Sequence, residues 1–180
     1  MKPLKILLLL NFWSIGLVAQ TDEFKHDWEI QYLEHDIQFV SKKIAPLPFS
    51  TNEEPQAIMI VGASMIDDSM KNNLKQIVKS EIETIRKDFN IIEYLEEDYK
   101  PKDNIVSYTE KLGSVQIATI KYRINGEKNG PTITPRSVRQ MLFIHNEKLY
   151  ISSLVVLFAE DQDNIRSDQM LFINKILGNN

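Results

Sequence analysis

The sequence predicts an α+β domain with a largely antiparallel β-sheet and helices packed on both faces of the sheet. One strongly amphipathic stretch, residues 69–89, has apolar side chains at helical spacing and predicts a long helix. The whole chain reads strand, strand, strand, helix, about five strands and helix, an order typical of α+β domains. Several of these strands are apolar on both sides, so we expect the helices to cover opposite faces of the sheet.

The first 19 residues have the three-part layout of a secretory signal peptide. Lys2 and Lys5 form the charged start, residues 6–18 form the apolar core, and Ala19 is the small residue before cleavage. This core is shorter than the roughly 20 residues that a membrane-spanning helix needs. We therefore expect cleavage after Ala19 and no stable membrane span in the mature chain, with an uncleaved N-terminal anchor as the alternative.

The mature chain of 180 − 19 = 161 residues is long enough for one domain, residues 20–180. It contains no cysteine, which excludes disulfides and lipid attachment at the cleavage site. Losing Lys2 and Lys5 changes the formal charge from −4 to −4 − 2 = −6, and no basic run remains that could follow a phosphate backbone. We expect a secreted or periplasmic protein that does not bind nucleic acid.

The start of the mature chain predicts a hairpin of two short strands. Trp28, Ile30 and Tyr32 alternate with polar residues, and the alternation resumes at Ile37 and Phe39. A helix is the alternative, because the aromatic residues of this stretch also fit a helical period. The loop that follows is rich in proline, and we expect it to be exposed.

The next segment predicts a strand that leads into the long helix. Residues 57–61 are continuously apolar, as in a strand that is covered on both faces. Asp67, Asp68 or Ser69 can cap the first N–H groups of the helix over 69–89, and basic residues occupy its last turn.

The second half of the chain predicts five strands and a closing helix. The apolar phase changes at Ser152 and Ser153, which predicts a β-bulge there, with a strand buried on both faces as the alternative. Asp161 or Asp163 can cap the closing helix, and Gly178 ends it. The five strands are expected within residues 91–95, 106–112, 115–124, 138–144 and 149–158.

This layout resembles the photosystem accessory protein PsbP and its non-photosynthetic relatives. The resemblance is carried by the strand 57–63 before the helix 69–89, the hairpin 139–158 and the closing helix that ends in FINKIL, residues 172–177. It covers nearly all of the mature chain and implies an α/β/α sandwich without catalytic residues. Members of the family are mostly binding or accessory proteins, and no site residue of the family has a matching motif here.

Ser64 is the strongest catalytic candidate in the sequence. It lies between a predicted strand and a predicted helix, as the serine of a nucleophile elbow does. That motif requires glycine on both sides of the serine, and Ile66 stands where the second glycine belongs. Gly62 is then better explained as the end of a strand. If Ser64 is a nucleophile, His145 is the histidine that we expect to assist it.

The sequence predicts no metal site and no cofactor. The three histidines are scattered, although His26 and His35 each have an aspartate beside them that could complete a ligand set. Asp161 and Asp163 resemble the start of a calcium loop, but Ile165 occupies a position that requires oxygen. Phosphate-binding and dinucleotide-binding glycine motifs are absent from the sequence.

Aromatic side chains gather near the N-terminus, where they form a hydrophobic core or line a cleft for a partner or an apolar ligand. They are Trp28, Tyr32, Phe39 and Phe49. The first functional hypothesis is therefore a non-enzymatic accessory domain that binds another secreted or envelope protein. The alternatives are a carrier of a small apolar ligand and a serine hydrolase that uses Ser64.

Overall fold

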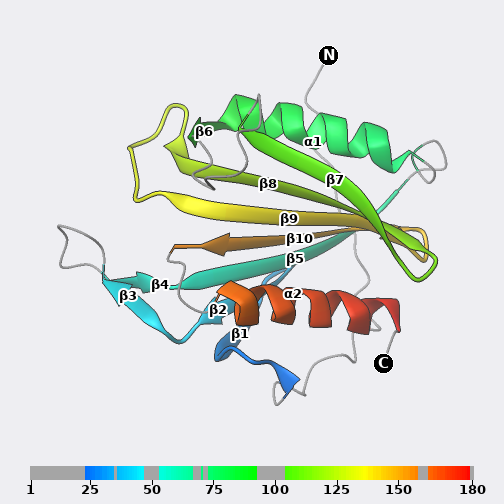
Figure 1. Cartoon of the computed structure of the whole chain (residues 1–180), viewed down its shortest axis with the longest axis horizontal. Helices are drawn as coiled ribbons and strands as arrows, with labels where there is room; N and C mark the ends of the chain where they lie inside the picture. The colour runs from blue at the N-terminus through cyan, green and yellow to red at the C-terminus, as the bar shows by residue number, and fades with distance from the viewer. Residues whose placement is uncertain are drawn as a thin grey trace.

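The fold was analysed in a computed structural model, which describes residues 23–34, 36–46, 53–66, 70, 73–92, 104–157 and 162–178. The predicted signal peptide, the candidate N-cap residues 67–69 of the first helix, His35, Phe49 and Asp161 lie outside these residues. The elements in chain order are β1 (Trp28–Tyr32), β2 (Asp36–Ser41), β3 (Ile44–Pro46), β4 (Glu53–Pro55), β5 (Ala57–Met65), α1 (Leu74–Asp88), β6 (Phe89–Ile92), β7 (Ile105–Leu112), β8 (Val115–Glu127), β9 (Arg136–His145), β10 (Lys148–Val156) and α2 (Gln162–Leu177) (Figure 1).

Eight of the strands form one antiparallel sheet. Its order is β1-β2-β5-β10-β9-β8-β6, and β7 also pairs with β8. β9 occupies one edge of β8, while β6 pairs near Ile124 and β7 pairs from Tyr122 to Val115. Since a strand has only two edges, β6 and β7 lie one after the other along the second edge of β8. β3 and β4 form a separate two-stranded sheet.

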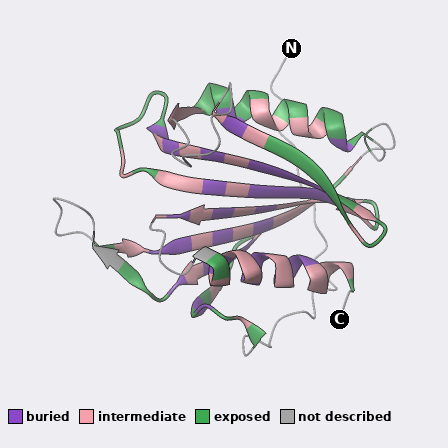
Figure 2. Ribbon diagram, viewed as in Figure 1, coloured by how far each residue is buried: buried purple, intermediate pink, exposed green. Residues whose placement is uncertain are grey.

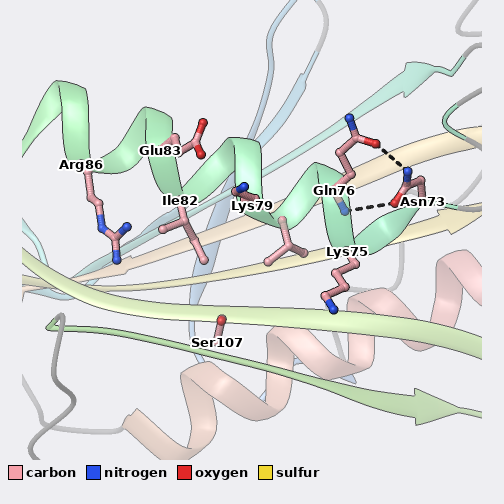
Figure 3. A pocket seen from close by; sticks show the side chains of 9 residues that line it. Asn73, Lys75, Gln76, Lys79, Ile82, Glu83, Arg86 and Ser107 are labelled. Atoms are coloured by element: carbon pink, nitrogen blue, oxygen red, sulfur yellow. Dashed lines mark hydrogen bonds between the residues drawn. The ribbon is translucent and has the colours of Figure 1, made fainter.

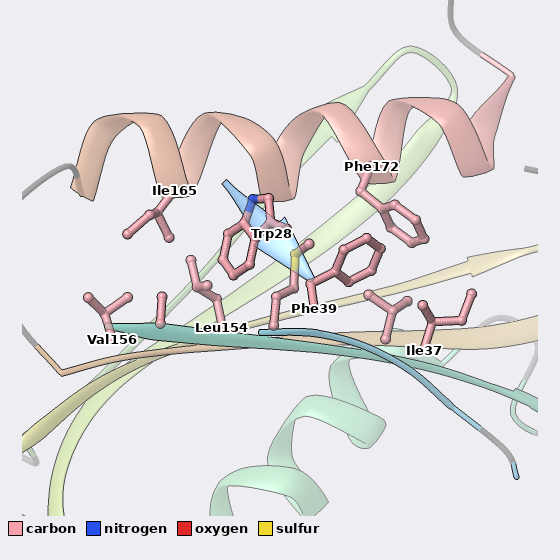
Figure 4. Packing of buried hydrophobic residues seen from close by; sticks show 10 residues of the cluster. Trp28, Ile37, Phe39, Leu154, Val156, Ile165 and Phe172 are labelled. Carbon is pink, nitrogen blue, oxygen red and sulfur yellow. The ribbon is translucent and has the colours of Figure 1, made fainter. Parts of the chain in front are cut away.

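The two helices contact opposite faces of the sheet and lie over different strands. α1 packs on β8, β9 and β6 through a cluster that includes Leu74, Ile85, Ile120 and Leu142. α2 packs over β1, β2, β5 and β10, where Phe172 and its neighbours meet the aromatic residues of the first hairpin (Figure 4). The central strands are largely buried, whereas β7 is exposed over most of its length (Figure 2).

The α/β/α sandwich expected from the sequence is wrong. The described part of the chain has one eight-stranded antiparallel sheet and only two helices, so a single helix and not a helical layer lies on each face. The periodic stretch at 69–89 indicated correctly that a helix forms, but apolar residues on both sides of a strand do not say how much of each face a helix covers. Residues 57–61 show the difference: Met59 is buried under α2, while Ile58 and Ile60 on the other face are only half-buried.

The ends of α1 differ from the prediction. The helix runs from Leu74 to Asp88 and not from 69 to 89, and Asn73 is its N-cap: the side-chain oxygen of Asn73 accepts a hydrogen bond from the N–H of Gln76 at 3.3 Å. The basic last turn is confirmed, with Arg86 and Lys87. The chain enters β6 directly at Phe89 because that residue adopts an extended conformation.

The β-bulge predicted at Ser152 and Ser153 is wrong. β10 keeps one register with both of its neighbours through this pair, so Ser152 lies opposite Met141 and Val61. The apolar phase changes because Ser152 is a polar residue on the buried face under α2, where Gln169 binds it. The predicted hairpin of β1 and β2 is confirmed, and a tight turn at Asn146 and Glu147, both with positive φ, joins β9 to β10.

Candidate functional site

A cleft of about 550 Å³ lies between α1 and the edge strand β7. We call it the α1–β7 cleft. On the α1 wall, Val78 and Ile82 supply apolar surface, and Lys75 and Lys79 supply positive charge. Ser107, a residue of β7, lines the opposite wall. Figure 3 shows that Lys75, Ile82 and Arg86 extend from α1 toward the strand that carries Ser107. The volume is within the range of about 300 to 1,000 Å³ that is usual for ligand sites.

The spacing along α1 explains why these side chains share one side of the helix. Lys75, Lys79, Ile82 and Arg86 follow each other at intervals of four, three and four residues, which is one stripe of an α-helix. The stripe lies beside the apolar one that packs on β8 and β9, and Val78 and Ile82 border both. The cleft residues of α1 are therefore held by a helix that the core anchors.

The cleft carries an excess of positive charge. Lys75, Lys79 and Arg86 line it together with one acidic residue, Glu83. Among the described residues, no salt bridge or hydrogen bond involves the ammonium group of Lys75 or Lys79, and both side chains are exposed. Two unneutralised cations beside apolar surface suit a partner group that is both negatively charged and partly apolar.

The β7 side of the cleft is an exposed strand. Ser107 to Lys111 are exposed, although Ile105 at the start of the strand is buried against α1. On the other face of β7, the ammonium group of Lys121 lies 5.4 Å from the ring centroid of Tyr108. That cation–π contact fixes the Tyr108 ring against β8 and leaves the cleft side of β7 open.

A second, shallow cleft of about 190 Å³ lies on the half of the sheet that α1 leaves uncovered. Ile60, Leu149 and Ile151 line it together with Ser64 and Asp36. The Asp36 carboxylate lies directly over Gly62, and a Cβ atom at Gly62 would overlap Asp36 Oδ1. Glycine at this position therefore makes room for a charged side chain at one end of an otherwise apolar surface.

The register places Ser64 and His145 on different faces of the sheet. Ser64 is opposite Leu149, and Leu149 is opposite Ile144, so these three side chains share one face. His145 follows Ile144 and projects from the other face. Because β10 also lies between them, the two backbones are roughly 10 Å apart, and the serine and the histidine are not within hydrogen-bonding reach of each other.

The aromatic candidates are divided between core and surface. Trp28 is 5% exposed and Phe39 is 2% exposed, and their rings pack edge to face with centroids 6.4 Å apart. Phe39 also meets Phe172 of α2 at 5.0 Å (Figure 4). Tyr32 is 62% exposed at the end of β1, and Phe49 lies outside the described residues. The structure thus uses Trp28 and Phe39 to hold α2 on the sheet.

Asp168 of α2 is the centre of a buried polar cluster. Its carboxylate accepts hydrogen bonds from the backbone N–H groups of Lys25 and His26, at 2.7 and 2.8 Å, and from Nε1 of Trp28 at 2.9 Å. Asp168 is completely buried, so these charge-assisted bonds replace its hydration. They fasten the segment before β1 to α2.

His26 and Ser41 are also hydrogen-bonded, at 2.7 Å between Nε2 and Oγ. The Ser41 hydroxyl donates its proton to the carbonyl oxygen of Lys43 at 3.2 Å. Both residues are buried, so the pair has a structural role.

A second buried polar cluster joins α2 to β9 and β10. Nε of Arg139 donates to Oε1 of Gln169 at 2.6 Å, and Nε2 of Gln169 donates to the carbonyl oxygen of Ser152 at 3.0 Å. Burial, and then the positive charge of Arg166, lower the pKa of Arg139 to about 10. Arg139 still carries its charge at neutral pH, and it orients Gln169.

Within the described residues, no group of three or more histidine, aspartate or glutamate side chains could hold a metal ion. None of the helices in the described part of the chain is long and apolar enough to cross a membrane.

The sequence contained a signal for the α1–β7 cleft, but periodicity alone did not identify it. Lys75, Lys79 and Glu83 fall outside the apolar stripe of α1. Residues outside that stripe can face solvent or line a cleft, and the sequence pattern does not distinguish these two cases. Only the pairing of β7 with the outer edge of β8 turns this side of the helix into one wall of a cleft.

Comparison with known proteins gives little further information. No family model matches the chain, and no curated protein is significantly similar to it. One solved structure with some likeness is that of PA94 from Pseudomonas aeruginosa, a candidate regulator of unknown function, with a TM-score of 0.44 and 11% identity over 81% of this chain and 94% of that chain. A likeness at this level says nothing about function. The resemblance to PsbP stays a prediction.

Proposed function

We propose that this protein is an exported, non-enzymatic accessory protein that binds another protein of the envelope or the secreted fraction through the α1–β7 cleft. The observation that carries the proposal is the composition of the cleft: two cations without a described ionic partner, Lys75 and Lys79, lie beside the apolar Val78 and Ile82. Such a mixture of charge and apolar surface is typical of protein recognition sites.

Four further features support this class of function. The N-terminal sequence predicts export, and the resemblance to PsbP implies a binding or accessory role. The hydrogen-bonded pair His26 and Ser41 is buried, and Ser64 is separated from His145.

Site-specific photo-crosslinking tests the proposal. A photoreactive amino acid at Ser107, inside the cleft, is compared with one at Thr84, an exposed residue of α1 that does not line the cleft. We expect the Ser107 probe to yield a discrete crosslinked partner in the native envelope or secreted fraction, and the Thr84 probe to yield none. The crosslink should disappear in the double variant Lys75→Glu/Lys79→Glu.

The control is a double variant with the same change in net charge away from the cleft, Lys25→Glu/Lys87→Glu. Lys25 lies before β1, and Lys87 is exposed on α1 but does not line the cleft. Equal crosslinking in both double variants, or equal crosslinking from Ser107 and Thr84, would rule the proposal out.

A carrier of a small apolar ligand is the second candidate, favoured by the shallow cleft at Ile60, Leu149 and Ile151. Its volume of about 190 Å³ is below the usual range for ligand sites, about 300 to 1,000 Å³, so it ranks second. Native mass spectrometry of the purified protein should show a retained non-protein mass if this candidate is right, and the bare protein mass alone if it is not.

A further inference from the structure

We infer that the partner segment in the α1–β7 cleft is an extended chain with two acidic side chains two residues apart, whose backbone pairs with the outer edge of β7. This inference rests on the proposed function and specifies the chemistry of the partner. Its observations are an edge of β7 that pairs with no other strand in the described part of the chain, the exposure of β7 and the spacing of Lys75 and Lys79.

The first observation is the edge itself. β7 pairs with β8 along Ile105–Leu112, and no other described strand pairs with it. Every second residue of such a strand directs its N–H and C=O groups outward, which is a template for another extended chain. At about 3.3 Å per residue, eight residues give about 26 Å of edge, enough for a partner segment of similar length.

The second observation is that the two helices leave β7 uncovered. Ile105 at the start of the strand packs against α1, but Ser107 to Lys111 are exposed, so neither helix covers this part of β7 (Figure 2). The sequence of β7 is nevertheless rich in residues that favour strands, among them Val106, Tyr108 and Thr109. An incoming strand would extend an existing sheet and would not have to reorganise the domain.

The third observation is a match of spacings. Lys75 and Lys79 are four residues apart on α1, which is about 6 Å along the helix axis. Two side chains on the same face of a strand, at positions i and i+2, are about 6.6 Å apart. In a strand added beside β7 and under α1, two acidic residues separated by one residue can therefore place their carboxylates at the ammonium groups of Lys75 and Lys79.

The apolar residues of the cleft specify the rest of the segment. Val78 and Ile82 lie between and beyond the two lysines on the same wall, and both are half-buried. The next side chain on the same face of the partner strand should thus be apolar. The full chain has a net formal charge of −4, which disfavours non-specific binding of acidic chains. An acidic segment is therefore attracted only at the positively charged cleft.

Synthetic peptides test the inference. The probe is a fluorescent octapeptide with blocked ends. It has threonine at the odd positions, glutamate at positions 2 and 4, and valine at positions 6 and 8. A control peptide of the same composition carries the two glutamates at adjacent positions, so that they project from opposite faces of a strand. We expect fluorescence anisotropy to show saturable binding of the probe to the full mature chain and about tenfold weaker binding of the control.

The cleft residues and the backbone are tested with the same probe. Lys75→Glu/Lys79→Glu should weaken binding about tenfold, and Lys25→Glu/Lys87→Glu should leave it unchanged. Two further probes are N-methylated at either the odd or the even residues. Only one set of amides faces β7 in an added strand, so one of these probes should lose binding and the other should retain it.

Several outcomes would overturn the inference: no binding of the probe, equal binding of the control, or equal effects of both N-methylated sets. Sedimentation showing that two copies of this chain pair through β7, with the dimer lost in Thr109→Pro, would also overturn it. If the peptides fail while the Ser107 crosslink still depends on Lys75 and Lys79, the inference falls and the proposed function stands. If the crosslink is also indifferent to those lysines, both fall.

Discussion

The buried carboxylate of Asp168 holds the segment at the start of β1 against α2. Three N–H donors from Lys25, His26 and Trp28 converge on its carboxylate, and they come from a segment that is 140 residues or more away in sequence. The sequence alone could not identify this partnership, because an aspartate inside a helix is ordinarily a solvated residue. The cluster decides where the first hairpin meets α2.

The Asp168→Asn variant should be less stable by about 2 to 4 kcal/mol. An asparagine side chain has a single acceptor oxygen, and its amide group would face donors that it cannot satisfy. Urea unfolding of the mature chain measures the change. Asp163→Asn, at an exposed position in the first turn of α2, is the matched control and should cost less than about 1 kcal/mol. Similar losses for both variants would contradict the role given to Asp168.

Tyr122 gives a pH dependence with a defined sign. Burial, and then the nearby Glu81, raise the pKa of Tyr122 above its ordinary value of 10.0. The fold thus favours the neutral phenol, and its stabilisation is complete below pH 10 and lost as the pH rises further. The free energy of unfolding of the wild type should fall more steeply than that of Tyr122→Phe, by up to about 1.4 kcal/mol per pH unit.

Urea titrations at intervals from pH 9 to pH 11.5 measure this difference. Curves for the wild type and Tyr122→Phe that stay parallel above pH 10 would show that the phenol ionises as easily in the folded protein as in the unfolded chain.

At the scale of elements, α1 illustrates which features local sequence determines. Its existence, its apolar stripe and its basic last turn follow from residue spacing, and the structure confirms them. Its start does not, because Asp67, Asp68 and Ser69 are as good caps by residue type as Asn73. The structure selects Asn73 through the hydrogen bond from the N–H of Gln76.

Replacing the cap should weaken α1 without changing the cleft charges. Asn73→Ala removes the acceptor for the N–H of Gln76 and should lower the free energy of unfolding by about 1 kcal/mol, whereas Asn73→Ser should retain most of the stability. Thermal and urea unfolding of the two variants provide the comparison. Equal stability of the alanine and serine variants would place the start of the helix elsewhere.

The strands show where residue patterns are insufficient. Alternation located the β1–β2 hairpin, which has one buried face, and the apolar pattern also placed β9 and β10, which are neighbours in the sequence and are buried on both faces. The same reasoning failed at Ser152. It explained a polar residue at a buried position of the strand by a β-bulge, whereas Ser152 is hydrogen-bonded inside the core to Gln169 of α2. Long-range satisfaction of polar groups is not visible in a local pattern.

At the scale of the molecule, the arrangement of the helices could not be derived from periodicity. Ile58 and Ile60 are as apolar as Met59, yet only Met59 is covered by a helix. Each helix lies over a different part of the sheet, and the uncovered parts create both clefts. The candidate site therefore arises from topology, in particular from the position of β7 at the outer edge of β8.

Export is a prediction about the whole chain. Mass spectrometry of the protein recovered from the extracytoplasmic fraction should show a mature chain that begins at Gln20, since Ala19 precedes the expected cleavage point. Leu8→Arg, which interrupts the apolar core of the signal, should retain the full-length chain inside the cell. A full-length wild-type chain anchored in the membrane would favour the uncleaved alternative.

Amide hydrogen exchange along Ile105–Leu112, resolved by NMR with and without the acidic octapeptide, tests the role of the α1–β7 cleft most directly. Amides that face β8 should be protected in both states. Those that face outward should exchange rapidly in the apo protein and become protected when the peptide is bound, giving an alternating pattern along β7. Saturation with peptide that leaves every β7 amide unchanged would contradict strand addition at this edge.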